Sequence, residues 1–452
     1  MSGPATPIPV EELRRTGWLA HWDRYWFGEG SLCRLGAFRM ILMAAAYYAV
    51  WHKGFGVFQH ADGADAVGYL QRVWNPIYAF QILGLEAPGP QAARRVYALL
   101  MFFIALGFVG LFSRLSTFVV AALSFYWIGT AYSFGKPHHD CIGLMFALAI
   151  LPFSPVGARL SVDSLVARWR SARRGGSMER PVLAPFAGLP LRLTMVTSAI
   201  GYFSAGASKL VLAGFGWMNG YTLLGIMTEY RSDWSDPLSE NLFLLQVMSV
   251  GLIGIQVAFP ITLFSVRSRW IFIPMAVGFH LMAMKTMATG PFLTLWFTLA
   301  AFIALERIPG VLRRGMTQGP LLWRMSFGAL FLGISYGIVA IYMQHKSPWL
   351  LAVLLPIVLA VLFQCLPRMR MELFHSSSAA RGWVAILRAL DWGDLLRFRE
   401  SEAGGATEPV SMASIAWRVP LLLPLVPFLG ALGGMGSGTA RGSFRRASKS
   451  AG

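Results

Sequence analysis

The sequence predicts an all-α fold, a polytopic bundle of transmembrane helices with about eight core spans and about two additional C-terminal spans. Of its 452 residues, 56% are hydrophobic and only 13% are charged, whereas about a quarter of the residues of a soluble domain carry charge. Several apolar runs reach the roughly 20 residues that a helix needs to cross a bilayer. We therefore expect an integral membrane protein.

The formal net charge of +18 comes from arginines that gather in short loops and at the ends of apolar runs. Loops of this kind are retained on the cytoplasmic side of a membrane. No zinc spacing or basic-aromatic module accompanies them, so the expected partners are membrane lipids with anionic headgroups and not nucleic acid. The three cysteines are far apart and form no CxxC motif, so we expect no disulfide framework and no metal.

The elements follow in order from an N-terminal interfacial segment (1–30), whose stretch 17–28 alternates Trp and Tyr with charged residues. Core spans are expected at about 31–51, 96–112, 117–132, 142–153, 191–212, 242–264, 270–287 and 291–305. Residues 307–366 hold two further transmembrane helices, at about 321–343 and 349–366. Residues 367–452 read as a basic amphipathic cytoplasmic region, with a surface helix at 383–398, followed by a disordered tail.

The arginine-rich loops all fall on one side of this arrangement, at the Arg114 turn, the 157–190 loop, the Arg267 turn and the 307–314 loop. The positive-inside rule then predicts a cytoplasmic N-terminus in the plasma (inner) membrane. With this orientation Lys209 lies late in its span, in the outer half of the membrane, because a helix rises about 1.5 Å per residue. His139 and His280 fall at comparable depth.

Lys209 is the most informative polar residue, because an ammonium within an apolar helix is costly and marks a functional site by default. It could instead extend to the headgroups, since it stands near the end of its span. Small residues at 204–208 precede it and permit close helix packing. A lysine in such a packed, desolvated setting loses its proton readily and could act as a base. From these residues alone both interpretations stay open.

The histidines have plainer interpretations as well. His138-His139-Asp140 could be a polar interfacial turn, and its spacing is weak evidence for a metal. His280 could be an ordinary buried histidine within an apolar run.

Several segments, in order, resemble the vitamin K-dependent gamma-glutamyl carboxylase and the wider bacterial family of its membrane module, called HTTM. Ala205-Gly-Ala-Ser-Lys209-Leu followed by Trp217-Met-Asn-Gly220-Tyr221 is similar to the segment that carries the family's catalytic lysine. Further similar segments are Phe38-Arg39-Met40, the short turn with Arg114, His139-Asp-Cys-Ile-Gly-Leu, Leu160-Ser-Val-Asp163 and Gly278-Phe-His280-Leu-Met. The resemblance covers roughly residues 17–306.

The resemblance implies that a lysine base deprotonates a reduced naphthoquinone, which then reacts with O2 to give a strong base. That base removes the gamma proton of a glutamate, and the resulting carbanion captures CO2. The implied catalytic residues are Lys209, His139 and His280. The implied substrate or quinone-binding residues are His138, Tyr202, Trp217 and Tyr221, and the implied structural residues are Arg39, Arg114 and Asp163. The implied acceptor is a peptide or protein.

Two departures from the family keep a second hypothesis open. Pro137 and His138 stand where the family has two asparagines, and no soluble docking domain follows residue 306. The first hypothesis is a quinol-dependent carboxylase or related enzyme at the outer membrane face. The second is a non-catalytic membrane component for the maturation or export of a secreted peptide or toxin.

Overall fold

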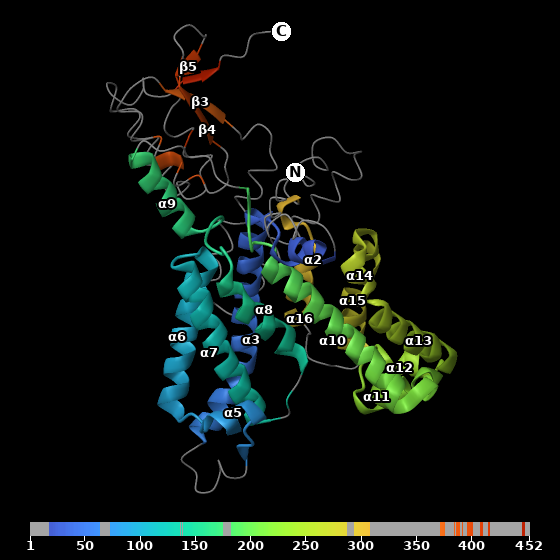
Figure 1. The fold of residues 1–452 in the computed structure, drawn as a ribbon. Coiled ribbons are helices and arrows are strands. Elements are labelled where there is room, and N and C mark those ends of the chain that lie inside the picture. Colours follow the sequence, from blue (N-terminus) through green and yellow to red (C-terminus); the bar gives the residue numbers. More distant parts are fainter. Residues whose placement is uncertain are drawn as a thin grey trace, which may run out of the picture. The chain divides into compact units, whose positions relative to one another are not determined.

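The computed structural model describes residues 18–63, 73–135, 137, 139–174, 182–286 and 293–307, and short pieces between 371 and 447. These residues are mostly helical (Figure 1). Contacts group the chain into two units. The first comprises 1–108, 112–156 and 182–304, and the second comprises 109–111, 157–181 and 305–452.

The first unit is built from helices that match most of the expected apolar runs. In chain order they are α2 (Trp18–Phe27), α3 (Leu32–Asp62), α5 (Tyr78–Leu83), α6 (Pro90–Val109), α7 (Ser113–Ser133), η1 (His139–Cys141), α8 (Ile142–Ile150), η2 (Leu151–Phe153), α10 (Leu189–Ala213), η3 (Gly214–Asn219), α11 (Tyr221–Glu229), α12 (Ser235–Ser239), α13 (Leu242–Ala258), α14 (Ile261–Phe264), α15 (Val266–Thr286), α16 (Leu293–Leu299) and η4 (Ala300–Phe302). The strands β1 (Gly30–Ser31) and β2 (Leu183–Ala184) form one short antiparallel pair.

Helix α3 is longer than the sequence indicated, because the expected span ended near residue 51 and the helix continues to Asp62. The continuation is buried at Val57 and Ala61. A Cβ atom added at Gly54 would be in ordinary van der Waals contact with the Tyr97 and Trp127 rings, so the helix is closely packed at a residue that by itself disfavours helix. As a result Lys53 lies on a helix, and not in the expected extramembrane connection.

Three described helices are long and apolar enough to cross a membrane, namely α3, α6 and α7. The segment 189–219, which comprises α10 and η3, is followed by α11 after a bend of 88°. It would add a fourth span if the two parts count as one. The segments expected as spans at 142–153 and 242–264 are shorter apolar helices, and α15 contains Pro274, Arg267 and Arg269. The two C-terminal spans expected between 307 and 366 lie outside the described residues.

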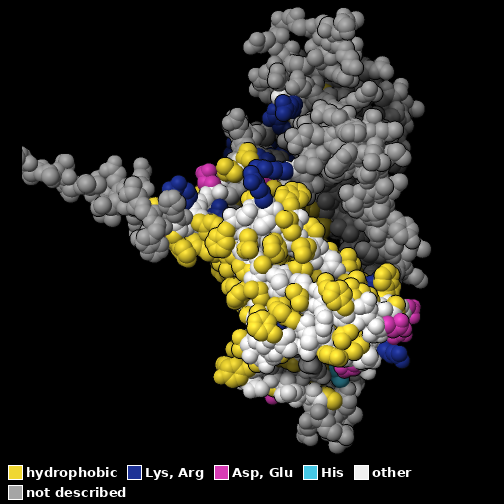
Figure 2. Space-filling view, turned by 90° about the vertical axis from the view of Figure 1, so that its right-hand side faces the viewer, with side chains coloured by type: hydrophobic (Ala, Val, Ile, Leu, Met, Phe, Trp, Pro, Cys, Tyr) yellow, Lys and Arg dark blue, Asp and Glu magenta, His cyan; other side chains and the backbone are white. Residues whose placement is uncertain are grey.

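A broad apolar surface with few charged side chains covers the face of the described residues shown in Figure 2. Large apolar side chains that are exposed in the first unit include those of Phe118, Phe146, Phe243, Phe264 and Trp270. Exposed apolar patches of this kind mark contact with lipid or with a partner. The fold is therefore compatible with an integral membrane protein.

The second unit contains α9 (Val162–Arg173), η5 (Leu305–Arg307) and a four-stranded sheet. Its strands are β3 (Met371–His375), β4 (Leu396–Glu400), β5 (Thr407–Pro409) and β6 (Arg445–Ala447), in the order β4-β3-β6-β5. β3 pairs with β4 in parallel, and the other two pairs are antiparallel.

This sheet was not predicted from the sequence. The strand β4 begins at Leu396, within the expected surface helix, and β6 lies within the expected disordered tail. Residues 384 and 386–388 are helical, so helix is found in the first part of the segment expected at 383–398, and strand at its end. Strands of three to five residues leave a weak local signal, and their pairing joins segments far apart in the chain.

Candidate functional site

The predicted lysine site lies where α10 packs against α13. Tyr202, Gly206 and Lys209 follow one another at spacings of four and three, which places them on one face of α10. A Cβ atom at Gly206 would come within 2.9 Å of Gln256 Cβ and of a Val257 methyl carbon. The two helices therefore approach each other closely at this glycine, as small residues in membrane helices permit.

Lys209 is half-buried, and its ammonium is held by uncharged groups. Lys209 Nζ donates a hydrogen bond to the Ala205 carbonyl at 2.8 Å and a second to Gln256 Oε1 at 3.3 Å. The ammonium also lies over the Trp217 ring, 5.4 Å from its centroid. No carboxylate of the described residues forms an ion pair with it.

Two helical turns before the lysine, Tyr202 joins α10 to α15. Its hydroxyl is hydrogen-bonded to His280 Nε2 at 2.9 Å, and both residues are buried. The Tyr202 ring stacks on Phe259 with centroids 4.2 Å apart, and Phe302 meets Phe259 edge-on. The result is an apolar, aromatic-walled region with a phenol–imidazole pair within it.

His139 begins the short η1 turn and is exposed. His139 exerts an electrostatic effect on His280, which is smaller than the effect of burial on that residue. His138 lies outside the described residues. Among those that are described, no group of three or more His, Cys, Asp or Glu residues has metal-binding geometry.

The segment after Lys209 contains two of the other predicted residues, with different outcomes. Trp217, in η3, contacts the lysine, whereas Tyr221 is exposed at the start of α11. Between them Gly220 adopts a φ of +85°, which glycine tolerates and which allows the sharp bend into α11. Among the described contacts of Lys209, none involves the Tyr221 side chain.

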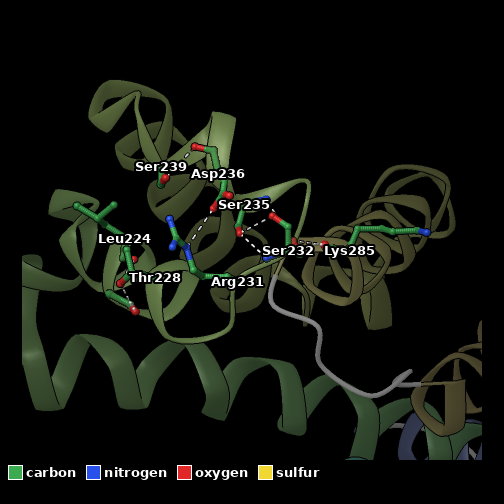
Figure 3. A network of polar contacts seen from close by, with 9 residues as sticks. Leu224, Thr228, Arg231, Ser232, Ser235, Asp236, Ser239 and Lys285 are labelled. Atoms are coloured by element: carbon green, nitrogen blue, oxygen red, sulfur yellow. Dashed lines mark hydrogen bonds and ion pairs between the residues drawn. The ribbon is translucent and has the colours of Figure 1, made fainter.

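A polar network fixes the α11–α12 connection beside α15 (Figure 3). Ser232 Oγ donates a hydrogen bond to the Lys285 carbonyl at 2.7 Å, and Arg231 pairs with Asp236 at 3.4 Å. Ser232 and Ser235 exchange bonds between backbone and side chains. The Lys285 carbonyl belongs to the last turn of its helix, where carbonyls need outside donors.

The three predicted structural residues occupy different settings. Arg39 is fully buried and donates to the Val156 carbonyl at 3.1 Å and to the Phe108 carbonyl at 3.3 Å, so it joins α3 to two other segments. Arg114 is exposed at the start of α7. Asp163 is in the first turn of α9, and its backbone N–H donates to the Gly110 carbonyl at 3.0 Å.

A second polar cluster was missed as such in the sequence, although its Asp140 was noted. Lys53 Nζ lies 3.1 Å from Asp140 Oδ2, and the Tyr132 hydroxyl donates to Asp140 Oδ1 at 2.5 Å. Thr294 Oγ1 donates to the Asp140 carbonyl at 2.6 Å, so side chains from α3, α7 and α16 all hold this turn. The available signal was a lysine just after the first expected span and an aspartate just before the fourth.

The electrostatics of this cluster favour a charged carboxylate. Burial by itself raises the pKa of Asp140, but the hydrogen bond from Tyr132 and the positive charge of Lys53 outweigh it, and the pKa lies below the ordinary value. The cluster therefore holds an ion pair next to His139.

Gln256 and Phe259 were also missed in the sequence. Gln256 is buried, and with Gln246 and Ser249 it is one of the few polar residues of the mostly apolar helix α13. Phe259 resembles many other aromatic residues in its region, so nothing local distinguished it.

No family model, curated protein or solved structure matches this chain.

Proposed function

We propose that this protein is an integral enzyme of the inner membrane, with a cytoplasmic N-terminus and a site in the outer half of the bilayer. It would couple oxidation of a reduced naphthoquinone by O2 to carboxylation, or another modification, of a peptide or protein. The observation that supports this most is the single face of α10 that presents the Lys209 amine and the Tyr202–His280 pair.

The residues around this face fit a flat apolar ring with two oxygens. Trp217 offers a ring beside the lysine, and the buried stack of Tyr202 and Phe259 keeps the surroundings of the Tyr202 hydroxyl apolar. Lys209 at one end, and Tyr202 with His280 at the other, provide hydrogen-bonding groups for the quinol oxygens. Tyr202 and Lys209 are seven residues apart, about 10 Å along the helix axis.

Lys209 would take the proton from a quinol hydroxyl. Its contacts are a carbonyl, an amide oxygen and an aromatic face. None of these carries a full negative charge, so they stabilise the charged ammonium less than a carboxylate would. A base that must be neutral before it acts needs such surroundings. When bound, the quinol would supply the electrons that reduce O2, with one oxygen atom ending in the quinone epoxide and the other in water, and this oxidation would provide the base that removes the substrate proton. His280, oriented by Tyr202, would hold the other oxygen of the ring.

A non-catalytic role in the maturation or export of a secreted peptide is the second candidate. One contact favours it, namely the hydrogen bond from Lys209 to the carbonyl of Ala205, four residues earlier on its own helix. A lysine that satisfies its own helix in this way could be purely structural.

Quinol turnover separates the two. Purified protein in lipid nanodiscs is given reduced menaquinone or vitamin K in air, with bicarbonate and a glutamate-containing peptide, and epoxide formation is followed. The proposal predicts turnover by the wild type, loss in Lys209→Ala, and retention in Lys285→Ala, where an exposed lysine of α15 is removed as a control. Absence of turnover by the wild type contradicts the enzyme and favours the second candidate.

A further inference from the structure

Helix α9 carries an unusual concentration of positive charge for its length. Arg168, Arg170, Arg173 and Arg174 lie within or directly after its last two turns, and Asp163 is its single acidic residue. Val166, Arg170 and Arg173 recur at spacings of four and three and are all exposed, so they share one open face. The Arg173 guanidinium stacks on the Trp169 ring at 4.1 Å.

The beginning of α9 is tied to a turn between two candidate membrane spans. The backbone N–H of Asp163 donates to the carbonyl of Gly110, the residue that follows the last residue of α6. Only residues 110–112 separate α6 from α7, and both helices are apolar and long enough to cross a bilayer. A turn that joins two consecutive spans must lie at a membrane surface, and the first turn of α9 lies there with it.

The N-terminal cap keeps α9 a regular helix from this point. The backbone N–H of Ser164 donates to Ser161 Oγ at 3.0 Å, and Ser164 Oγ donates back to the Ser161 carbonyl at 2.8 Å. These bonds satisfy groups that a helix end otherwise leaves open. The arginines are therefore displayed from an ordered helix whose first turn is tied to Gly110.

We propose that the exposed face of α9 is a docking surface for anionic phospholipid headgroups of the leaflet at the 110–112 turn. Guanidinium groups bind phosphate oxygens in a bidentate manner, and a basic residue close to an anionic leaflet strengthens binding roughly fivefold. Trp169 beneath Arg173 provides the amphipathic ring that is typical of membrane interfaces. This inference rests on the membrane spans and is independent of any catalysis at Lys209.

The test uses the full-length protein with its three cysteines replaced by alanine and an added Val166→Cys that carries a fluorophore. The labelled protein is placed in nanodiscs that contain brominated phosphatidylglycerol, or brominated phosphatidylcholine at the same mole fraction. Stronger quenching by the anionic lipid is expected, and it should weaken at high salt because exposed charges are screened.

Two triple variants separate charge from other effects. Arg170→Gln/Arg173→Gln/Arg174→Gln should remove the preference for the anionic lipid, with a loss of roughly fivefold for each arginine. Arg170→Lys/Arg173→Lys/Arg174→Lys retains the charge and should keep most of the preference. Equal quenching by the two lipids, no quenching by either, or an unchanged preference in the glutamine variant would overturn the proposal.

Discussion

Two lysines on long apolar helices, Lys209 on α10 and Lys53 on α3, have opposite surroundings. Lys53 lies 3.1 Å from the Asp140 carboxylate, which also accepts a hydrogen bond from Tyr132. Lys209 is held by a carbonyl, the amide of Gln256 and the face of Trp217. Each ammonium is partly shielded from solvent, so the difference lies in the charge of the partners.

An ion pair stabilises the charged form of both partners, whereas neutral acceptors leave a lysine without a compensating charge. Lys53 is therefore suited to holding structure, and it holds the turn that begins with His139. Lys209 is suited to exchanging a proton. The sequence placed Lys53 just after its expected span and Lys209 within a span, and only the structure shows the partners that separate their roles.

The largest expected effect is on quinol turnover. Lys209→Met should lower the turnover number by about two to four orders of magnitude, the range that general bases contribute, with little change in thermal unfolding. Lys53→Met should keep turnover within about tenfold of the wild type while weakening the fold. Epoxide formation and thermal unfolding measured on the same preparations check this. An equal loss of turnover in the two variants would remove the distinction.

The next effect is on stability at Lys53. Lys53→Met leaves a half-buried carboxylate without its cation, which we expect to cost about 1–3 kcal/mol of unfolding free energy. Arg94→Met is the matched control, since its pair with Asp62 has side chains that are 63% and 50% exposed, against 17% and 20% for Lys53 and Asp140. That exposed pair should contribute about 0–1 kcal/mol. Thermal unfolding in detergent measures both, and an equal loss would show that the Lys53 pair is an ordinary surface contact.

Two glycines of α10 test the contact that brings Gln256 to Lys209. Gly206→Ala places a methyl group within 2.9 Å of Gln256 Cβ and should destabilise the fold by about 1–3 kcal/mol through overpacking. In Gly201→Ala the added Cβ atom would meet no atom within 4 Å. This variant should be neutral or stabilising by up to about 1 kcal/mol, because alanine favours helix. Unfolding temperatures of the two variants give the comparison. A tolerated Gly206→Ala would mean that α10 and α13 can separate at no cost.

The smallest effect is a pH dependence at Asp140. Its pKa is depressed in the folded protein below the ordinary 3.8, so its contribution to stability is present above pH 3.8 and is lost as the pH falls below that value. The difference in unfolding temperature between wild type and Asp140→Asn should therefore persist from neutral pH to about pH 4 and shrink below it. A difference that grew on acidification would contradict a charged Asp140.

Local pattern was sufficient for much of the helical fold. The apolar run predicted at 191–212 is α10, Leu189–Ala213, and the run predicted at 117–132 is α7, Ser113–Ser133. The shared face of Tyr202 and Lys209 was not inferred in advance, although it follows from their spacing along one helix. The strands β3 to β6 escaped prediction, since a short strand is defined by a partner elsewhere in the chain.

The sequence by itself determined that this chain is rich in apolar helices and that a lysine stands within one of them. Only the tertiary structure decided which groups meet that lysine. Gln256 reaches it because Gly206 lets α13 approach, and His280 reaches Tyr202 because α15 packs beside α10. Asp140 likewise pairs with Lys53, and not with Lys209. Side-chain partners across helices depend on how the helices cross, and a period of 3.6 residues within one helix carries no information about that.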